Sequence, residues 1–277
     1  MDGIFLANGT WLGFSDTGAG LPVVFLHPTP LDRAYWRPLT KELAGIRAII
    51  PDLRGHGVSE TGSALPVGSF ARVPDAPALT MEQLSADVLA LLDHLHLRTA
   101  VFAGCSIGGY VLLELWRKAP QRMRGLAFVC SKPQPDGDAN LARRAATIAQ
   151  AKSEGVDAIF DGMAQNLLGE TSRRNRPELV AELRARMTLT VEALVAVHAG
   201  LATRPDSVPT VATISAPILA IAGDEDSTVA PAEMEAFRLA PGGCEFHLIP
   251  AVGHFAAYEQ PRNLAALMAP WLRQFEV

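Results

Sequence analysis

Eight short apolar runs, separated by longer segments of helical character, constrain the fold of this chain more than any other feature. Runs that are apolar on both faces and joined by helices are typical of a parallel sheet covered by helices on both sides. Asn8-Gly9, a hairpin signal, separates the first two runs, so those two strands should be antiparallel. The pattern predicts an α/β fold with strands at residues 3–7, 11–15, 22–27, 47–51, 100–104, 125–130, 217–223 and 244–249.

The alternation stops between residues 132 and 207, where helical segments follow one another with no strand between them. We predict four helices there, punctuated by glycines at helix stops or breaks, within residues 138–155, 156–169, 176–187 and 190–202. The sequence therefore predicts a core made of residues 1–131 and 208–277, with residues 132–207 as a helical cap.

Charge and composition argue against several classes of partner. A net charge of -5 gives no electrostatic case for nucleic acid or for an anionic membrane. No apolar run approaches the roughly 20 residues of a membrane helix, and the first residues lack the basic segment of a signal peptide. Three widely spaced cysteines suggest reduced thiols and a cytoplasmic location. Neither CxxC nor HExxH spacing occurs, so we expect no metal site.

A strand, a sharp turn and a helix follow one another in VFAGCSIGGYVLLELW, residues 101–116. The turn has the pattern G-x-S-x-G, with Ser106 between Gly104 and Gly108. In this setting the serine adopts strained dihedrals and projects its hydroxyl above the sheet, while the glycines leave room where a Cβ would strike a neighbouring element. We predict that Ser106 is a nucleophile and that Cys105, one residue out of register, points aside into packing.

A serine hydroxyl is a weak nucleophile and needs a base. His254 lies in PAVGHFAAYEQP, between the last strand and the final helix, where a loop can place its imidazole over Ser106. The other histidines have simpler interpretations as helix-end, strand, turn or packing residues: His27, His56, His94, His96, His198 and His247.

The acid that orients the base should follow another strand. AIAGDEDSTVAP ends a strand at Gly223 and then offers Asp224, Glu225 and Asp226, which gives the chain order Ser, Asp, His. The spacing G-x-x-D favours Asp226 over Asp224.

An oxyanion hole requires two N–H donors. The helix after the serine supplies the amide of Ile107. In FLHPTPLDRAYW, after the third strand, Pro28 has no N–H but Thr29 has one, so we assign the hole to Thr29 and Ile107. The same sequence can also serve as a rigid turn.

Together, DLRGHGVS, GCSIGGYVLLEL, GDED and GHFAAYEQP resemble the serine-dependent α/β-hydrolases over nearly the whole chain. The resemblance implies an eight-stranded sheet with an antiparallel second strand and a helical cap after the sixth strand. Within the superfamily the chain is similar to the branch of carboxylesterases, 3-oxoadipate enol-lactonases and cofactor-free haloperoxidase-like perhydrolases. Pro28 departs from the glycine usual in that loop, and a serine at 106 argues against the dehalogenase and epoxide hydrolase branches.

These residues predict a hydrolase that cleaves a small ester or lactone through an acyl-enzyme, without a cofactor. The alternatives are an enol-lactone hydrolase, a perhydrolase, or a non-enzymatic ligand receptor on the same fold. A homodimer is compatible with the sequence. We expect substrate contacts from residues of the cap, the third strand and the loop after the last strand: His27, Phe160, Met163, Leu167, Met187 and Phe255.

Two further expectations concern the pocket. A specifically placed cap arginine would indicate an acidic substrate, although solvated helix faces are the simpler interpretation of Arg143, Arg144, Arg173, Arg174, Arg176, Arg184 and Arg186. The Gly- and Pro-rich loop 61–79 should follow a strand at the edge of the sheet where this fold places its ligands, so Phe70 and Val73 are expected near the pocket mouth.

Overall fold

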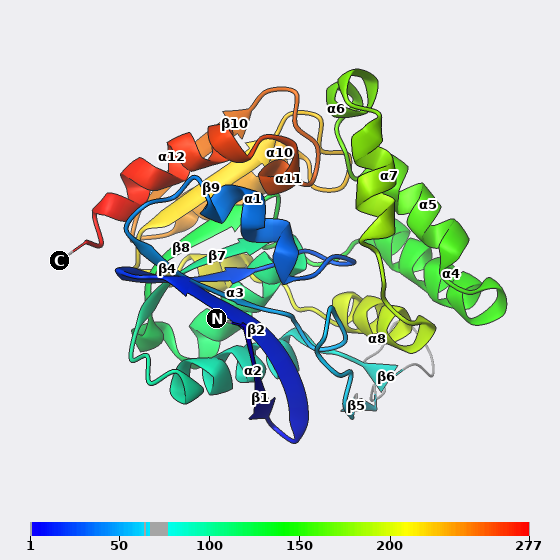
Figure 1. Ribbon diagram of the computed structural model, residues 1–277, viewed down its shortest axis with the longest axis horizontal. Coiled ribbons are helices and arrows are strands. Elements are labelled where there is room, and N and C mark those ends of the chain that lie inside the picture. Colours follow the sequence, from blue (N-terminus) through cyan, green and yellow to red (C-terminus); the bar gives the residue numbers. More distant parts are fainter. Residues whose placement is uncertain (1, 64, 67–76, 277) are drawn as a thin grey trace.

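The computed structural model describes residues 2–63, 65–66 and 77–276 and shows a mixed sheet with helices on both faces (Figure 1). Phe70 and Val73 lie outside the described residues. The sheet has eight strands in the order β1-β2-β4-β3-β7-β8-β9-β10. Their bounds are Asp2–Ala7 (β1), Thr10–Gly18 (β2), Leu21–Leu26 (β3), Ile46–Pro51 (β4), Ala100–Cys105 (β7), Met123–Val129 (β8), Ile218–Gly223 (β9) and Cys244–Ile249 (β10).

Strand directions agree with the sequence pattern. β2 is antiparallel to both β1 and β4, and the remaining neighbours are parallel. Asn8 and Gly9 form the β1–β2 turn with φ of 49° and 78°, the left-handed conformation that asparagine and glycine tolerate best. The two-residue strands β5 (Leu65–Pro66) and β6 (Pro77–Ala78) pair separately and were not predicted.

Alternate residues of the central strands enter two different apolar clusters, one on each face of the sheet. In β3, Val23 and Phe25 pack in the cluster that contains Trp271, whereas Val24 and Leu26 pack in the cluster that contains Leu112. Every residue of β7 and β9 is buried, which explains why these strands read as continuous apolar runs. The helices of the core are α1 (Arg37–Thr40), α2 (Met81–His94), α3 (Ile107–Lys118), α9 (Val208–Val211), α10 (Pro231–Met234), α11 (Ala256–Glu259) and α12 (Pro261–Arg273).

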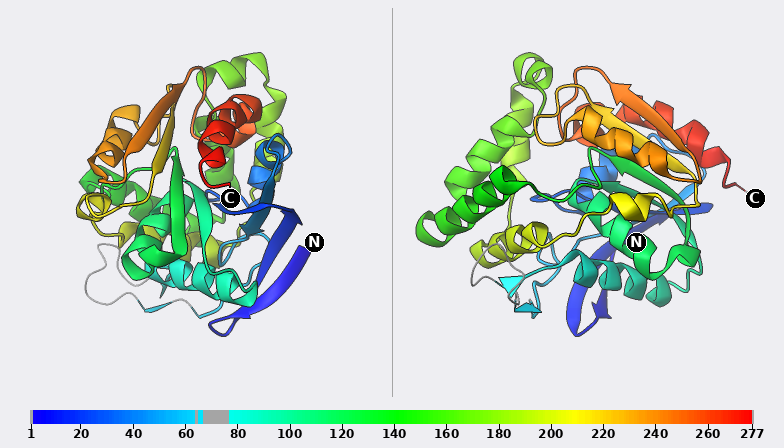
Figure 2. Two further views of the ribbon diagram at one scale, coloured as in Figure 1. Left: turned by 90° about the vertical axis from the view of Figure 1, so that its left-hand side faces the viewer. Right: turned by 180° about the vertical axis from the view of Figure 1, so that it is seen from behind.

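Residues 132–207 contain five helices rather than four, and they stand at one end of the sheet (Figures 1 and 2). The unpredicted helix is α6, whose sequence ETSRRN has no apolar residue and therefore no periodicity to detect. The five are α4 (Asp138–Glu154), α5 (Asp157–Asn166), α6 (Glu170–Asn175), α7 (Glu178–Ala185) and α8 (Val191–Ala202).

The apolar interior of the cap continues into the core. Phe160 of α5 and Leu183 of α7 belong to the same buried cluster as Tyr35 and Phe255, which lie beneath the cap. This shared cluster holds the helices of 132–207 against the edge of the sheet where β7, β9 and β10 end. Within the described part of the chain, no helix combines the length and apolar character needed to cross a bilayer.

Candidate active site

Ser106 lies between the end of β7 and the start of α3, in the sharp turn that the G-x-S-x-G pattern predicts. Its φ of 51° and ψ of -118° are strained for a residue with a side chain. A Cβ on Gly104 would lie 2.5 Å from the backbone of Gly108, and a Cβ on Gly108 would lie 2.2 Å from the carbonyl oxygen of Leu26. Only glycine fits at these two positions, because backbone atoms of α3 and β3 occupy the space.

Cys105 turns away from this site into the core, as expected. It is fully buried, it accepts a hydrogen bond from the Tyr35 hydroxyl at 3.3 Å, and it donates to the His254 carbonyl at 3.6 Å. Burial raises the pKa of the Cys105 thiol well above its ordinary value. A protonated thiol packed under the sheet edge is a poor nucleophile.

Asp226 and His254 form a buried pair next to the turn. Asp226 Oδ2 lies 2.8 Å from His254 Nδ1, and the two side chains are 0% and 2% exposed. Asp226 Oδ1 also accepts from the amides of Thr228 and Val229 at 2.8 and 3.0 Å. Burial alone would raise the pKa of Asp226, but His254 and these amides hold that pKa below its ordinary value. Asp226 is therefore a carboxylate that fixes a proton on Nδ1 and leaves Nε2 free to act as a base.

The neighbouring acids have other partners. Asp224 is exposed and accepts a hydrogen bond from the Val252 amide at 3.4 Å, whereas Glu225 accepts from the Thr171 amide at 2.7 Å. Of the three acids after β9, Asp226 alone contacts His254 among the described residues.

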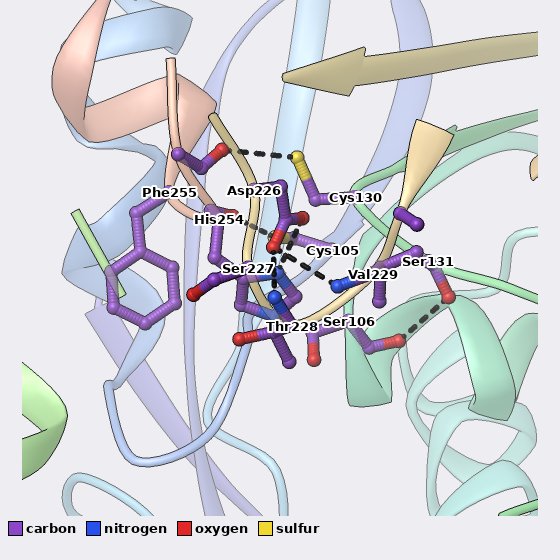
Figure 3. A network of polar contacts seen from close by, with 12 residues as sticks. Cys105, Ser106, Cys130, Ser131, Asp226, Ser227, Thr228, Val229, His254 and Phe255 are labelled. Atoms are coloured by element: carbon purple, nitrogen blue, oxygen red, sulfur yellow. Dashed lines mark hydrogen bonds and ion pairs between the residues drawn. The ribbon is translucent and has the colours of Figure 1, made fainter. Parts of the chain in front are cut away.

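Figure 3 shows Ser106, Asp226 and His254 gathered where three strands end. Ser106 follows β7, Asp226 follows β9, and His254 follows β10. In the described structure the Ser106 hydroxyl makes no hydrogen bond, while the Ser106 carbonyl accepts one from the Ser131 hydroxyl at 2.9 Å. Nucleophile–base contacts are often longer in unliganded sites than in substrate complexes.

The two predicted oxyanion donors retain free N–H groups. Among the described residues, the amides of Thr29 and Ile107 donate to no protein acceptor. The Thr29 hydroxyl lies 3.1 Å from His56 Nε2, and His56 Nδ1 lies 3.0 Å from the Arg54 carbonyl. Burial lowers the pKa of His56 to about 3, so a neutral imidazole fixes the Thr29 loop.

Two of the six predicted pocket residues line a cavity of about 390 Å³ beside the cluster. Met163 of α5 and Leu167, the residue that follows α5, line this cavity. The other four are buried and are not among the residues that line this cavity: His27, Phe160, Met187 and Phe255.

The contacts of these residues explain their placement. His27 Nε2 accepts from the Leu53 amide at 2.9 Å and its Nδ1 lies 3.0 Å from the Pro28 carbonyl, so both ring nitrogens are occupied. Phe160 packs beneath the Arg184 guanidinium, and Phe255 packs against Tyr35 and the ring of His254.

Glu259 is a residue of this site that sequence reasoning missed. Its carboxylate is buried and accepts from the amides of Gly253 and Phe255, on either side of His254, at 3.0 and 3.3 Å. It also accepts from the Gly169 amide of the cap at 2.9 Å. The only sequence signal was an acid within an otherwise apolar segment of GHFAAYEQP.

The cap is joined to the same loops by further bonds. The His254 amide donates to the Leu167 carbonyl at 2.9 Å, and the Ser227 hydroxyl donates to the Asn166 carbonyl at 3.1 Å. The α5–α6 junction therefore contacts the loops that carry both Asp226 and His254. No cluster of His, Cys, Asp or Glu able to hold a metal ion occurs among the described residues.

The chain is similar to known hydrolases over its full length. A thermophilic esterase from Thermogutta terrifontis matches with a TM-score of 0.89 and 32% identity, covering 100% of both chains. The 3-oxoadipate enol-lactonase 2 of Acinetobacter baylyi is 28% identical over 227 residues, 81% of this chain and 78% of that protein. A candidate non-heme haloperoxidase of Mycobacterium phage D29 is 34% identical over 122 residues, and that match spans 39% of its length.

A sequence family described as the alpha/beta hydrolase fold matches residues 22–261, most of the chain. That range contains the serine turn after β7, the acidic loop after β9 and the histidine loop after β10. The eight-stranded sheet, with its antiparallel second strand and the helices inserted after β8, has the architecture that the resemblance implied. The chain belongs to the α/β-hydrolase fold family.

Proposed function

We propose that the protein is a serine hydrolase that cleaves small carboxylic esters or lactones. The observation that carries this proposal is the buried Asp226–His254 pair beside a serine held in a strained turn. In this pair Asp226 Oδ2 lies 2.8 Å from His254 Nδ1. This arrangement contains a nucleophile, a base and an acid that orients the base. The likeness to the Thermogutta terrifontis esterase and to the Acinetobacter baylyi enol-lactonase supports an ester or lactone as substrate.

In the first half of the reaction, His254 Nε2 takes the proton of Ser106 Oγ as Oγ bonds to the carbonyl carbon. The negative charge that develops on the carbonyl oxygen is stabilised by the N–H groups of Thr29 and Ile107. Asp226 holds Nδ1–H and stabilises the imidazolium. The bond from the carbonyl carbon to the alcohol oxygen then breaks, and His254 gives its proton to the departing alcohol.

In the second half, water attacks the acyl-enzyme and gives its proton to His254. The bond from the carbonyl carbon to Ser106 Oγ breaks, the proton returns to Oγ, and the carboxylic acid leaves. In a lactone the alcohol stays attached to the acid, so the same steps open the ring. All proton transfers use side chains of this protein, so the mechanism uses no cofactor.

Hydrolysis of p-nitrophenyl acetate and p-nitrophenyl butyrate tests the proposal. The wild-type protein should release p-nitrophenol, and Ser106→Ala should lower kcat by about four orders of magnitude or more. Absence of turnover on these esters and on a panel of lactones would favour the ligand-receptor alternative, and a peroxide-dependent activity with acetate would favour a perhydrolase. A cytoplasmic location and a homodimer stay predictions.

A further inference from the structure

Three residues that line the cavity beside the site are hydrogen-bonded to the Ser–His–Asp group, one to each member. Tyr110 donates its amide to the Ser106 carbonyl at 3.2 Å, Thr228 donates its amide to Asp226, and Leu167 accepts from the His254 amide. The far walls are formed by α4, α5 and α8 of the cap. The cavity therefore lies next to the backbone segments that carry all three residues.

The polar wall of the cavity has an excess of positive charge. Arg144, Arg143 and Lys132 line it, against a single lining carboxylate, Asp136. The charge of Lys132 is neutralised by an ion pair with Glu233, whose Oε1 lies 2.5 Å from Lys132 Nζ; Glu233 does not line the cavity. Asp136 is shared between Arg144 and the buried Arg204, so one carboxylate faces two guanidinium groups.

Arg144 has donors to spare. Only its Nε is bonded to Asp136, and its other guanidinium nitrogens have no protein partner among the described residues. The second guanidinium, of Arg204, is fixed over the ring of Tyr110 at 3.9 Å and by a 2.8 Å bond to Asp136. Asp136 and Arg204 therefore hold Arg144 in place, while its unbonded guanidinium nitrogens remain available to a ligand in the cavity.

His198 adds an unsatisfied polar group on the same wall. It is 6% exposed and lines the cavity, yet neither of its ring nitrogens has a hydrogen-bond partner among the described residues. Burial, helped by the charge of Arg144, lowers the pKa of His198 to about 3, so the ring is neutral and offers one donor and one acceptor. Protein atoms cover both ring nitrogens, so His198 borders the cavity through its carbon atoms and makes this part of the wall uncharged.

We propose that this cavity is a carboxylate-binding site in which Arg144 holds a second acidic group of the substrate. The inference rests on the proposed function and narrows its substrates to esters whose acyl chain ends in a carboxylate, such as half-esters of dicarboxylic acids. Met163 and Leu167 contact the apolar middle of that chain, and the arginine contacts its end.

The direct test compares mono-p-nitrophenyl glutarate with p-nitrophenyl valerate, which has the same carbon chain without the second carboxylate. Wild type should prefer the glutarate ester by about tenfold or more in kcat/KM, because only that ester can form a charge-assisted hydrogen bond with Arg144. Arg144→Gln should lower that ratio by about tenfold. Lys152→Gln removes an exposed charge from the same helix and is the matched control, with an unchanged ratio.

A binding measurement separates this inference from the proposed function. Calorimetry should show that glutarate binds to Ser106→Ala, and that adding Arg144→Gln weakens binding about tenfold or more. Hydrolysis of both esters with no preference for the charged one would overturn the inference and leave the proposed function standing. Arg144-dependent glutarate binding without any hydrolysis would uphold the site and overturn the proposed function. If wild type shows no preference for the charged ester and glutarate binding does not depend on Arg144, the inference is overturned.

His198→Leu also shows whether the imidazole has a structural role. Replacing a buried ring that lacks partners with an apolar side chain should leave Tm unchanged or raise it. A large loss of Tm in His198→Leu would show that the ring stabilises the protein through packing.

Discussion

Asp226 has the geometry of an orienting acid, and Asp224, two residues earlier, does not. The Asp226 carboxylate is buried against His254 Nδ1, whereas Asp224 is exposed. Asp226→Asn should lower kcat by about 10⁴-fold, because an amide at this position favours the wrong imidazole tautomer. Asp224→Asn is the matched control and should stay within about tenfold of wild type. If Asp224→Asn were the more damaging change, the G-x-x-D assignment would be wrong.

Glu259 positions His254 without touching the reacting atoms. Its carboxylate accepts three backbone N–H groups, from Gly253, Phe255 and the cap residue Gly169. Glu259→Gln replaces one acceptor oxygen by a donor, so at least one buried amide loses its partner. We expect a loss of about 1–3 kcal/mol in the free energy of unfolding, measured by urea denaturation.

The kinetic consequence of Glu259→Gln distinguishes positioning from general stability. A displaced His254 loop should lower kcat more than it raises KM, at a temperature where the variant is fully folded. Glu225→Gln, which removes a cap contact after β9 instead, is the comparison variant. Equal kcat for Glu259→Gln and wild type would show that the loop keeps its geometry without the carboxylate.

At the scale of elements, helix α5 and the residue that follows it bring the apolar side chains of Met163 and Leu167 to the cavity. Shortening either one, in Met163→Ala or Leu167→Ala, should shift preference toward longer acyl chains by about 1–3 kcal/mol per methylene-sized change. The measurement is kcat/KM across p-nitrophenyl esters of increasing length. Met187→Ala is the control, because Met187 is buried away from the cavity. It should cost about 2–5 kcal/mol of stability and leave the chain-length profile unchanged.

The elements that could be predicted are those with a clear pattern of apolar residues or a clear turn signal. The sheet strands are continuous apolar runs, and the β1–β2 hairpin follows from Asn8-Gly9. Helix α6 was not predictable, because its six residues are polar and show no apolar periodicity. The helix depends on its neighbours instead: the Thr171 amide and hydroxyl donate hydrogen bonds to Glu225, and α6 packs on α7.

The same distinction applies to the candidate site. Ser106, Asp226 and His254 could be found because each follows a recognisable strand in a fixed chain order. The pocket residues could not, because an apolar side chain on a cap helix looks the same whether it faces a cavity, as Met163 does, or the core, as Phe160 does. The hydrogen bond between Gly169 and Glu259 joins residues 90 positions apart, and spacing alone cannot reveal it.

At the scale of the whole molecule, buried histidines tie stability to pH. Burial lowers the pKa values of His27, His56 and His198 from 6.5 to about 4, 3 and 3. Below pH 6.5 these histidines become protonated in the unfolded chain but stay neutral in the folded protein. Protonation therefore stabilises the unfolded chain, and the free energy of unfolding is full above pH 6.5 and decreases as the pH falls. Each histidine contributes a slope of about 1.4 kcal/mol per pH unit, which gives about 4 kcal/mol per unit for the three.

Urea denaturation between about pH 6 and pH 4.5 measures this slope. His198→Leu should lower it by about 1.4 kcal/mol per pH unit relative to wild type, since one of the three titrating rings is gone. An identical slope in the two proteins would show that His198 takes up a proton in the folded state and that its burial does not keep it neutral.

The central claim, that Ser106 is an activated nucleophile, is tested most directly by covalent labelling with a fluorophosphonate followed by peptide mapping. We expect one adduct, on Ser106, formed equally in wild type and Cys105→Ala and abolished in Ser106→Ala. His254→Ala should slow its formation by several orders of magnitude, because the base that takes the serine proton is missing. An adduct on Cys105, or labelling of Ser106 that does not depend on His254, would contradict the account.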